Sequence, residues 1–453
     1  MVKLTEQNRE QYAKSILDAL NVEDIQEFRH LFLELHPQDQ LDFFLELTEI
    51  QRKKVYEYLS PEEFSEIFQE LELEEQKNTI EELDTIYTQS VFAEMSADDA
   101  ADFLGEVPEA TVKRVLDGLE SEDAKDIREL LSYEEETAGA IMTKEFINIT
   151  AQSTVRDVIE LLRQEGPDAE TIYYLYVVNG NHELAGVVSL RDLIISDPNE
   201  KVENVMSTRV VSVKTDDDQE DVANLIKKYD FLAVPVVTST NTLVGIITVD
   251  DIIDVIEEEA TEDIGELAAS RGATDVNLSS FTAAKKRSPW IIMLMFFGLI
   301  TAGVIGQFEE TLEQIVLLAV FIPLLMDSAG NTGTQSLAVM VRSLATGSFE
   351  KKGMFNTIKR EFGTGIFLGL ICAIVLMILI PIVYGDVMIA IIVAVSLFFT
   401  LSIATIVGAV VPVIINKMKL DPAIASGPFI TTVNDVLGLM IYFSIATAML
   451  QYL

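Results

Sequence analysis

The segment KKRSPWIIMLMFFGLITAGVIG, residues 285–306, marks the point where the sequence changes from an acidic to an apolar composition. Five apolar runs follow it to the C-terminus, at 290–306, 315–341, 362–384, 387–415 and 422–450. An α-helix needs about 20 residues to cross roughly 30 Å of hydrocarbon, whereas apolar runs in soluble cores rarely exceed about 14. The runs therefore predict five membrane-spanning helices.

The basic residues between these runs predict the orientation in the membrane. They precede the first run, separate the second from the third, and separate the fourth from the fifth: Lys285, Lys286, Arg287, Arg342, Lys351, Lys352, Lys359, Arg360, Lys417 and Lys419. The other two connections contain no basic residue. Because Lys and Arg are enriched in cytoplasmic connections, we expect a multi-pass protein of the cell membrane. Residues 1–280 would lie in the cytoplasm and Leu453 outside.

The net charge of −41 belongs to the first 280 residues, because 10 basic residues nearly balance 9 acidic ones from Phe281 onward. So strong a negative field repels nucleic acid and anionic lipid surfaces, and it attracts cations. Nucleic-acid binding is therefore excluded. The one cysteine, Cys372, lies in an apolar run, so the chain has no disulfide framework.

Asp435 is the sharpest functional candidate, because it lies near the middle of the last apolar run. A carboxylate at that depth is costly unless it faces water or a cation. Thr431 and Gly427 precede it by one and two helical turns on the same face. Pro428 is expected to free backbone carbonyls there, since it cannot donate a helical hydrogen bond. No basic residue lies inside a run to pair with Asp435, so the alternative to a metal-binding aspartate is a protonated structural one.

The stretch DSAGNTGTQS, residues 327–336, places small and polar residues in the second predicted span. Such residues either let helices pack closely or line water, and both roles remain open here. Mg²⁺ keeps several waters and binds through one or two carboxylates. Two copies of Asp435 across a dimer axis would therefore suit a hydrated Mg²⁺. Soft metals are disfavoured, because no cluster of Cys, Met or His accompanies the carboxylate.

The cytoplasmic part contains a duplicated segment. The two copies open with IMTK (141–144) and VMST (205–208), and they close with LAGVVSLRDLI (184–194) and LVGIITVDDII (243–253). Helices and strands that alternate in two copies predict a duplicated α/β unit. The pattern resembles a pair of CBS domains, at 137–198 and 199–253.

CBS pairs dimerise and commonly bind adenine nucleotides such as ATP. The resemblance implies nucleotide contacts at Arg191, Asp192, Phe231 and Asp251. The alternative is an empty pair with a purely structural role.

Residues upstream of this pair predict short amphipathic helices. Recurrent helix starts are expected at His36, Ser60, Ser96 and Ser121, and they indicate a small helical solenoid. Downstream of the pair, an acidic helix leads toward the membrane and ends near Asp421, at the start of the last span. Like charges held close there repel one another, and bound divalent cations would remove the repulsion.

The whole chain is similar to the MgtE family of magnesium channels. The resemblance rests on the domain order and on the motifs GNTG (330–333) and LDPA (420–423), the second of which leads to Asp435. It implies a multidomain fold: an α-helical N-domain of superhelical repeats (1–136), an α/β CBS pair (137–253), an acidic connecting helix (254–280) and an all-α transmembrane domain of five helices (281–453).

The resemblance also implies a homodimeric, Mg²⁺-selective channel. Its pore would be lined by Asp435, Thr431, Gly427 and Asn331. Cytoplasmic Mg²⁺ would close the pore by binding Asp98, Asp99, Asp102, Glu220, Asp230, Asp251, Asp254, Glu259, Glu262, Asp263 and Asp421.

Two other functions remain open. One is a channel or carrier for another divalent cation, such as Co²⁺ or Mn²⁺. The other is a membrane-anchored sensor of metal or nucleotide that conducts nothing. An enzyme is not expected, because the sequence contains no P-loop, no phosphorylated-aspartate motif and no nucleophile–base constellation.

Overall fold

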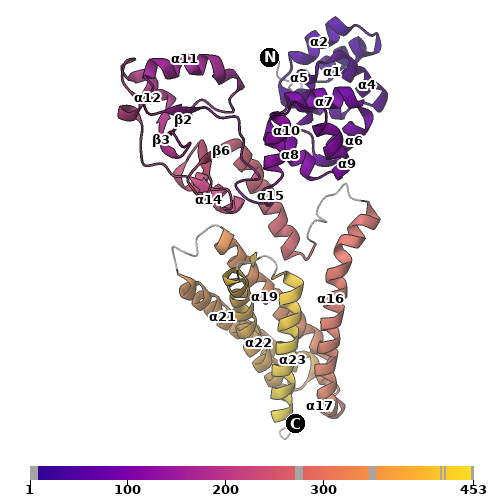
Figure 1. Ribbon diagram of the computed structural model, residues 1–453. Helices are drawn as coiled ribbons and strands as arrows, with labels where there is room; N and C mark the ends of the chain where they lie inside the picture. Colours follow the sequence, from indigo (N-terminus) through magenta and orange to yellow (C-terminus); the bar gives the residue numbers. More distant parts are fainter. Residues whose placement is uncertain (1–8, 271–278, 346–352, 419–420, 423–424, 450–453) are drawn as a thin grey trace. The chain divides into compact units, whose positions relative to one another are not determined.

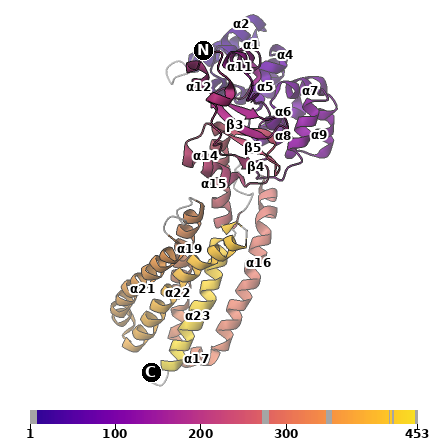
Figure 2. The same cartoon turned by 60° about the vertical axis from the view of Figure 1, so that its left-hand side comes forward.

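The computed structural model describes residues 9–270, 279–345, 353–418, 421–422 and 425–449. The chain divides into two compact units, Met1–Val255 and Ile256–Leu453. The first unit holds a helical N-domain followed by two small α/β modules, and the second is helical (Figures 1 and 2). The predicted multidomain fold class is confirmed.

The N-domain consists of short helices, each of which buries one apolar stripe. In the described residues they are α1 (Arg9–Asn21), α2 (Ile25–Leu33), α3 (Pro37–Leu45), α4 (Glu49–Tyr58), α5 (Pro61–Phe68), α6 (Leu73–Glu82), α7 (Thr85–Glu94), α8 (Ala97–Gly105), α9 (Glu109–Leu116) and α10 (Asp123–Leu130). Fully buried rings such as Phe28, Phe64 and Phe92 form a continuous core along them. Side chains of this size let helices of two to three turns bury enough surface to be stable.

Three of the predicted helix starts are confirmed. His36, Ser60 and Ser96 are the N-cap residues of α3, α5 and α8. At Ser60 the capping box is complete, because the Glu63 carboxylate also accepts the backbone N–H of Ser60. The start at Ser121 is wrong by one residue, since Glu122 is the N-cap of α10.

The two α/β modules share one topology, as the duplicated sequence predicts. Their strands are β1 (Asn148–Thr150), β2 (Tyr174–Val178) and β3 (Leu184–Ser189), then β4 (Val213–Lys214), β5 (Ala233–Val237) and β6 (Leu243–Thr248). Each sheet has a parallel pair followed by an antiparallel pair, with an irregularity at the same place. Their helices are α11 (Val155–Glu165), the 3₁₀ turn η1 (Gly166–Asp168), α12 (Leu190–Ile195), α13 (Val202–Val205), α14 (Gln219–Tyr229) and α15 (Val249–Leu267).

The opening segment of each copy crosses to the other module. Thr143 bridges to Ile246 of β6, and Ser207 bridges to Val187 of β3. The adjacent methionines cover a glycine in each sheet: a Cβ at Gly186 would lie 2.7 Å from the Met206 sulfur, and one at Gly245 would lie 2.6 Å from the Met142 sulfur. The same arrangement therefore recurs in both copies, and a side chain larger than that of glycine would crowd the methionine and the backbone carbonyl above it.

The helices of the second unit match most of the predicted spans. They are α16 (Ser280–Gln307), α17 (Glu309–Gln314), α18 (Leu317–Val320), α19 (Ile322–Ala345), α21 (Met354–Tyr384), α22 (Val387–Lys417) and α23 (Gly427–Met449). Among the described residues, α16, α21, α22 and α23 are long and apolar enough to cross a membrane. The predicted second span is interrupted near Phe321, and its main part is α19. At 24 residues, α19 extends for about 36 Å, but its polar stretch lowers its hydropathy, so the count of five spans stays a prediction.

The last span begins later than expected. Its helix starts at Gly427, so Pro428 occupies the first turn, where backbone N–H groups have no helical acceptor in any case. The expectation that Pro428 frees carbonyls within the span is therefore wrong. The Pro428 carbonyl accepts a 2.9 Å hydrogen bond from Thr432 Oγ1, and Asp435 lies two turns into the helix.

Helix α19 packs against α22 and α23 through small residues. A Cβ at Gly408 of α22 would overlap the carbonyl oxygen of Gly333, and a Cβ at Gly333 would overlap the amide of Asn434 on α23. Close packing, one of the two roles left open for residues 327–336, therefore applies to the face of α19 that carries Gly333.

Candidate functional site

The pore candidates lie on α19 and α23, which run antiparallel. A Cβ at Gly427 would lie 3.3 Å from Thr334 Cγ2, and a Cβ at Gly330 would lie 2.6 Å from Thr431 Cγ2. The two hydroxyls, Thr334 Oγ1 and Thr431 Oγ1, are 3.5 Å apart. Thr431 therefore faces α19, one helical turn before Asp435 on α23.

Asp435 is half-buried, and its Oδ1 atom is buried with no hydrogen-bond partner among the described residues. Asn331 Nδ2–H donates a 3.1 Å hydrogen bond to Asp327 Oδ1. A buried carboxylate oxygen without a donor is uncommon in folded proteins and is a place where a water or an ion is expected.

Gly427 has a different setting from the other pore candidates. It is buried, and a Cβ there would lie 3.1 Å from the carbonyl oxygen of Leu267, at the end of α15. Leu267 also packs against buried residues of the membrane unit, which include Leu337, Ala425 and Ile430. The connecting helix thus ends against the start of α23.

The same end of α15 carries carboxylates next to Asp421. Burial raises the pKa of Asp263, and the charges of Asp421 and Glu262 raise it further, while Arg342 acts in the opposite direction. Glu262 and Glu259 are partly buried on the same helix. This arrangement agrees with the expected approach of acidic groups at the start of the last span.

A second group of carboxylates lies where α8 of the N-domain approaches the second α/β module. Asp98 and Asp99 lie in the first turn of α8, and Asp251 lies in the first turn of α15. Burial raises the pKa of all three carboxyls, and repulsion from neighbouring carboxylates adds to it. Asp98 Oδ1 is buried without a hydrogen-bond partner in the described part of the chain.

Glu170 belongs to this group although no sequence pattern predicted it. Desolvation by its surroundings raises its pKa to about 7, together with repulsion from Asp98, Asp251, Asp250 and Glu145, although the residue itself lies at the surface. Nearby, Lys144 forms ion pairs with Asp126 at 3.1 Å and Glu129 at 2.6 Å. These pairs fix α10 to the opening segment of the first α/β module.

The remaining regulatory candidates are more scattered. Asp102 is exposed on α8, and Asp254 is exposed on α15. Glu220 and Asp230 lie at opposite ends of α14, about 15 Å apart along the helix, so one chain cannot bring them to the same ion. Across the described ranges, no three His, Cys, Asp or Glu side chains converge as a ready metal site. Paired carboxylates without a full cage suit a cation that keeps most of its water.

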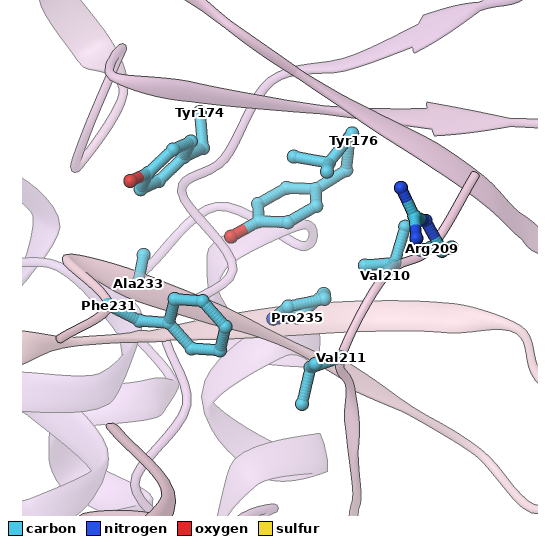
Figure 3. A pocket seen from close by; sticks show the side chains of 9 residues that line it. Tyr174, Tyr176, Arg209, Val210, Val211, Phe231, Ala233 and Pro235 are labelled. Carbon is cyan, nitrogen blue, oxygen red and sulfur yellow. The ribbon is translucent and has the colours of Figure 1, made fainter. Parts of the chain in front are cut away.

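A cavity of about 110 Å³ lies between the two α/β modules (Figure 3). The rings of Tyr174, Tyr176 and Phe231 face it, and Arg209 lies on the side away from Tyr174. Tyr176 is 1% exposed, and its hydroxyl has no hydrogen-bond partner in the described residues. Flat rings, an unused hydroxyl and one guanidinium are suited to an aromatic ligand with an anionic group.

Of the predicted nucleotide residues, Phe231 lines this cavity. Arg191 and Asp192 do not line it and lie in the first turn of α12, just after β3. Tyr174 pairs with Ser189 across β2 and β3, and Ser189 Oγ–H donates a 2.6 Å hydrogen bond to Asp192 Oδ2 at the start of α12. Arg191 immediately precedes Asp192 in the chain. Asp251 does not line this cavity and instead belongs to the carboxylate group at α8.

The duplicated sequence shows that the two equivalent positions differ in charge. Aligning LRD (190–192) with VDD (249–251) places Asp250 opposite Arg191, and aligning IMTKE (141–145) with VMSTR (205–209) places Glu145 opposite Arg209. One site thus has two arginines where the other has two carboxylates. This alignment was the sequence signal that could have identified Arg209 and Glu145.

Comparison with known proteins defines the class of the chain. Residues 35–136 match the MgtE intracellular N domain, residues 138–197 and 202–258 match CBS domains, and residues 322–445 match the family described as divalent cation transporters. These matches define a multi-pass membrane transporter with an intracellular N domain and a CBS pair, and not an enzyme.

The chain belongs to the MgtE family. It is 43% identical to the magnesium transporter MgtE of Bacillus subtilis over 95% of both chains, and 41% identical to that of Enterococcus faecalis over 98% of this chain and 99% of the relative. The expected family is confirmed.

Two solved structures resemble the first unit. The soluble part of a magnesium transporter has a TM-score of 0.54 and 45% identity, and it covers 56% of this chain and 99% of its own. The cytosolic domain of the Mg²⁺ channel MgtE in complex with ATP has a TM-score of 0.52 and 40% identity, and it covers 54% of this chain and 99% of its own.

Proposed function

We propose that the protein is a Mg²⁺ channel of the cell membrane that works as a homodimer and closes when cytoplasmic Mg²⁺ binds its acidic domains. The observation that carries the proposal is Asp435, a carboxylate two turns inside a spanning helix, with a buried oxygen for which the described residues supply no donor. Relatives over nearly the whole length are named magnesium transporters.

The pathway would run along α23 and α19. Asp435 would attract the hydrated ion, and Thr431 and Asn331 would present polar groups to its water. Gly427 has no side chain, which lets the backbone of Leu267 approach the start of α23 closely. Asp327, Asn331 and Gln335 are exposed on one face of α19 in the single chain. Because lipid cannot satisfy such a face, a second copy and a water-filled path between the copies are its natural surroundings.

The orientation is supported by where the helices place their basic residues. Lys285, Lys286 and Arg287 lie in the first turns of α16, Arg342 lies near the end of α19, and Lys359 and Arg360 lie near the start of α21. Lys417 ends α22. Successive antiparallel spans thus carry their positive charge at the same end, which is the cytoplasmic end by the positive-inside rule.

Closure would use the two carboxylate groups. When Mg²⁺ is scarce, Asp263 and Asp421 repel each other, as do Asp98, Asp99 and Asp251. Divalent ions with their water would bridge these groups and hold the connecting helix against α23. Asp102, Glu220, Asp230, Asp254, Glu259 and Glu262 would supply further ligands, in part across the dimer.

ATP would occupy the cavity of Figure 3. Phe231 and the two tyrosines suit the adenine ring, Asp192 suits the ribose hydroxyls, and Arg209 and Arg191 suit the phosphates. The equivalent position that contains Asp251, Asp250 and Glu145 has the charge of a cation site and would repel a triphosphate.

Uptake of Mg²⁺ into vesicles that contain Asp435→Asn and Asp435→Ala variants tests the pathway. Both variants are expected to form the same dimer as the native protein and to lose Mg²⁺ uptake. Uptake at the native rate in both would remove Asp435 from the pathway. Uptake of Co²⁺ or Mn²⁺ in preference to Mg²⁺ by the native protein would replace the magnesium assignment with another divalent cation.

A further inference from the structure

We infer that Asp327 is a second carboxylate of the ion pathway, level with Asp435 on the neighbouring helix, and that both hold the same hydrated divalent cation. The inference rests on the proposed channel function and specifies its binding site. The sequence analysis assigned one pore carboxylate per protomer, Asp435, and the family resemblance gave no role to Asp327.

The first argument is the register of the two helices. Moving from the cytoplasmic end, Gly427 faces Thr334 and Thr431 faces Gly330. Each step of four residues along α23 thus matches about four residues backward along α19. One more step takes α23 to Asp435 and α19 to the turn that contains Asp327.

The second argument is independent and concerns the exposed face of α19. Asp327, Asn331 and Gln335 are spaced by four residues, so they form one stripe along the helix, and all three are exposed in the single chain. The opposite face is closed by Gly333 against Gly408 and Asn434. A carboxylate and two amides cannot face lipid at this depth, so this stripe borders water.

The third argument is the unpaired Oδ1 atom of Asp435, which is buried among the described residues. A cation beside it would satisfy this oxygen. On the other side, Asn331 Nδ2–H donates to Asp327 Oδ1 at 3.1 Å, and this bond orients the carboxylate. Asn331 is therefore a positioning residue for Asp327.

The consequence is a site with four carboxylates in a dimer rather than two. Mg²⁺ exchanges its water slowly and is bound through few direct ligands, so several carboxylates around an intact hydration shell favour a small divalent ion over a monovalent one. Asp435 and Asp327 together would set the affinity for the ion. With Asp435 alone, one side of the ion would be surrounded only by neutral groups.

The test is Mg²⁺ uptake by the full-length protein in vesicles, measured over a range of external Mg²⁺. Asp327→Asn is expected to raise the half-saturating concentration about ten-fold, which equals ~1.4 kcal/mol, and Asp327→Glu is expected to stay closer to the native value. Glu313→Gln, an exposed acidic position on α17, is the matched control for loss of one negative charge and is expected to behave as the native protein.

The outcomes separate this inference from the proposed function. If Asp435→Asn abolishes uptake while Asp327→Asn keeps the native half-saturation and preference for Mg²⁺, Asp327 is not part of the site and the channel stands. If the native protein carries no Mg²⁺, both proposals fail together.

A second experiment does not depend on transport, so it remains informative if a variant loses transport because it misfolds. Asp327→Cys in a Cys372→Ser background is expected to react with a charged, membrane-impermeant methanethiosulfonate reagent, and external Mg²⁺ is expected to slow the reaction. A thiol that stays unreactive in a folded dimer would place residue 327 against lipid or protein and would overturn the inference.

Discussion

Ser336 Oγ–H on α19 donates a 2.7 Å hydrogen bond to Glu361 Oε2 on α21, and this carboxylate is buried. The other oxygen, Glu361 Oε1, accepts from the Arg360 guanidinium at 2.9 and 3.2 Å. Ser336 is one turn beyond Thr332 of the GNTG motif. The bond thus ties the helix that carries the pore candidates to a helix outside the pathway.

Replacing Glu361 is therefore expected to destabilise the membrane unit. Glu361→Leu leaves Ser336 without its buried acceptor and Arg360 without its counter-charge, which costs roughly 1–3 kcal/mol. Glu361→Gln keeps an acceptor for Ser336 and is expected to cost less. Thermal unfolding of the detergent-solubilised protein measures both variants, and equal melting temperatures for all three proteins would refute the structural role.

The contact between α19 and α22 predicts that one added methyl group prevents folding of the membrane unit. In Gly408→Ala, the new Cβ overlaps the Gly333 carbonyl oxygen, and neither backbone can move without separating the helices. We expect little folded dimer by size-exclusion chromatography. Gly363→Ala on α21 is the matched control, because no atom of the described residues lies within 4 Å of a Cβ there, and it is expected to fold normally. A normal Gly408→Ala dimer would show that α19 and α22 are not packed this closely.

The carboxylate group at α8 predicts a pH dependence in metal-free buffer. Glu170 has a pKa of about 7 in the fold against an ordinary value of 4.5, and the pKa values of Asp98, Asp99 and Asp251 are also raised. Between these limits the folded protein binds more protons than the unfolded one, so the free energy of unfolding falls as the pH rises from about 4.5 to about 7.

Hydrogen exchange of α8 and the start of α15 measures this effect in the full-length protein. Exchange is expected to become faster across that pH range, beyond the intrinsic change of exchange rate with pH, and Mg²⁺ at neutral pH is expected to slow it again. Glu170→Gln removes one of the titrating groups and is expected to weaken the dependence. A native protein whose protection is constant from pH 5 to pH 8 would contradict the electrostatic account of this group.

The charge difference between the two equivalent sites predicts where ATP binds. Arg209→Glu gives the first site the charge of the second, and it is expected to raise the Kd for ATP by about ten-fold or more, since a charge-assisted contact is worth roughly 1.5–3 kcal/mol. Glu145→Gln changes the charge at the equivalent position and is expected to leave the Kd unchanged. Titration calorimetry of both variants measures the Kd for ATP. A larger increase of this Kd in Glu145→Gln than in Arg209→Glu would assign ATP to the equivalent site that contains Asp251.

Much of the fold follows from patterns in the sequence. The capping residues of α3, α5 and α8, the duplicated α/β unit and the long apolar helices were all predictable, because each depends on residues close together in the chain. The interruption of the second span near Phe321 was not, since it depends on how α17 and α18 pack against other helices. Nor was the late start of α23, because a proline suits the first turn of a helix as well as a break within one.

The candidate sites divide in the same way. Asp435 is identifiable from the sequence because a carboxylate stands out in an apolar run. Asp327 is harder to interpret, because it lies in a polar stretch of which one face packs closely and the other is exposed. Only the helix register supports the inference that it lies level with Asp435. Glu170 has no sequence signal at all, since its neighbours Asp98 and Asp250 come from separate elements.

The most direct test of the central claim is Mg²⁺ uptake into vesicles that contain the purified native protein, with internal Mg²⁺ either absent or millimolar. An inside-negative potential, worth ~2.3 kcal/mol per charge per 100 mV, drives the ion in both cases. We predict rapid uptake at low internal Mg²⁺ and little at millimolar internal Mg²⁺, with the cytoplasmic face inside. Equal uptake at both levels would contradict closure by cytoplasmic Mg²⁺, and no uptake at either level by a folded dimer would contradict the channel itself.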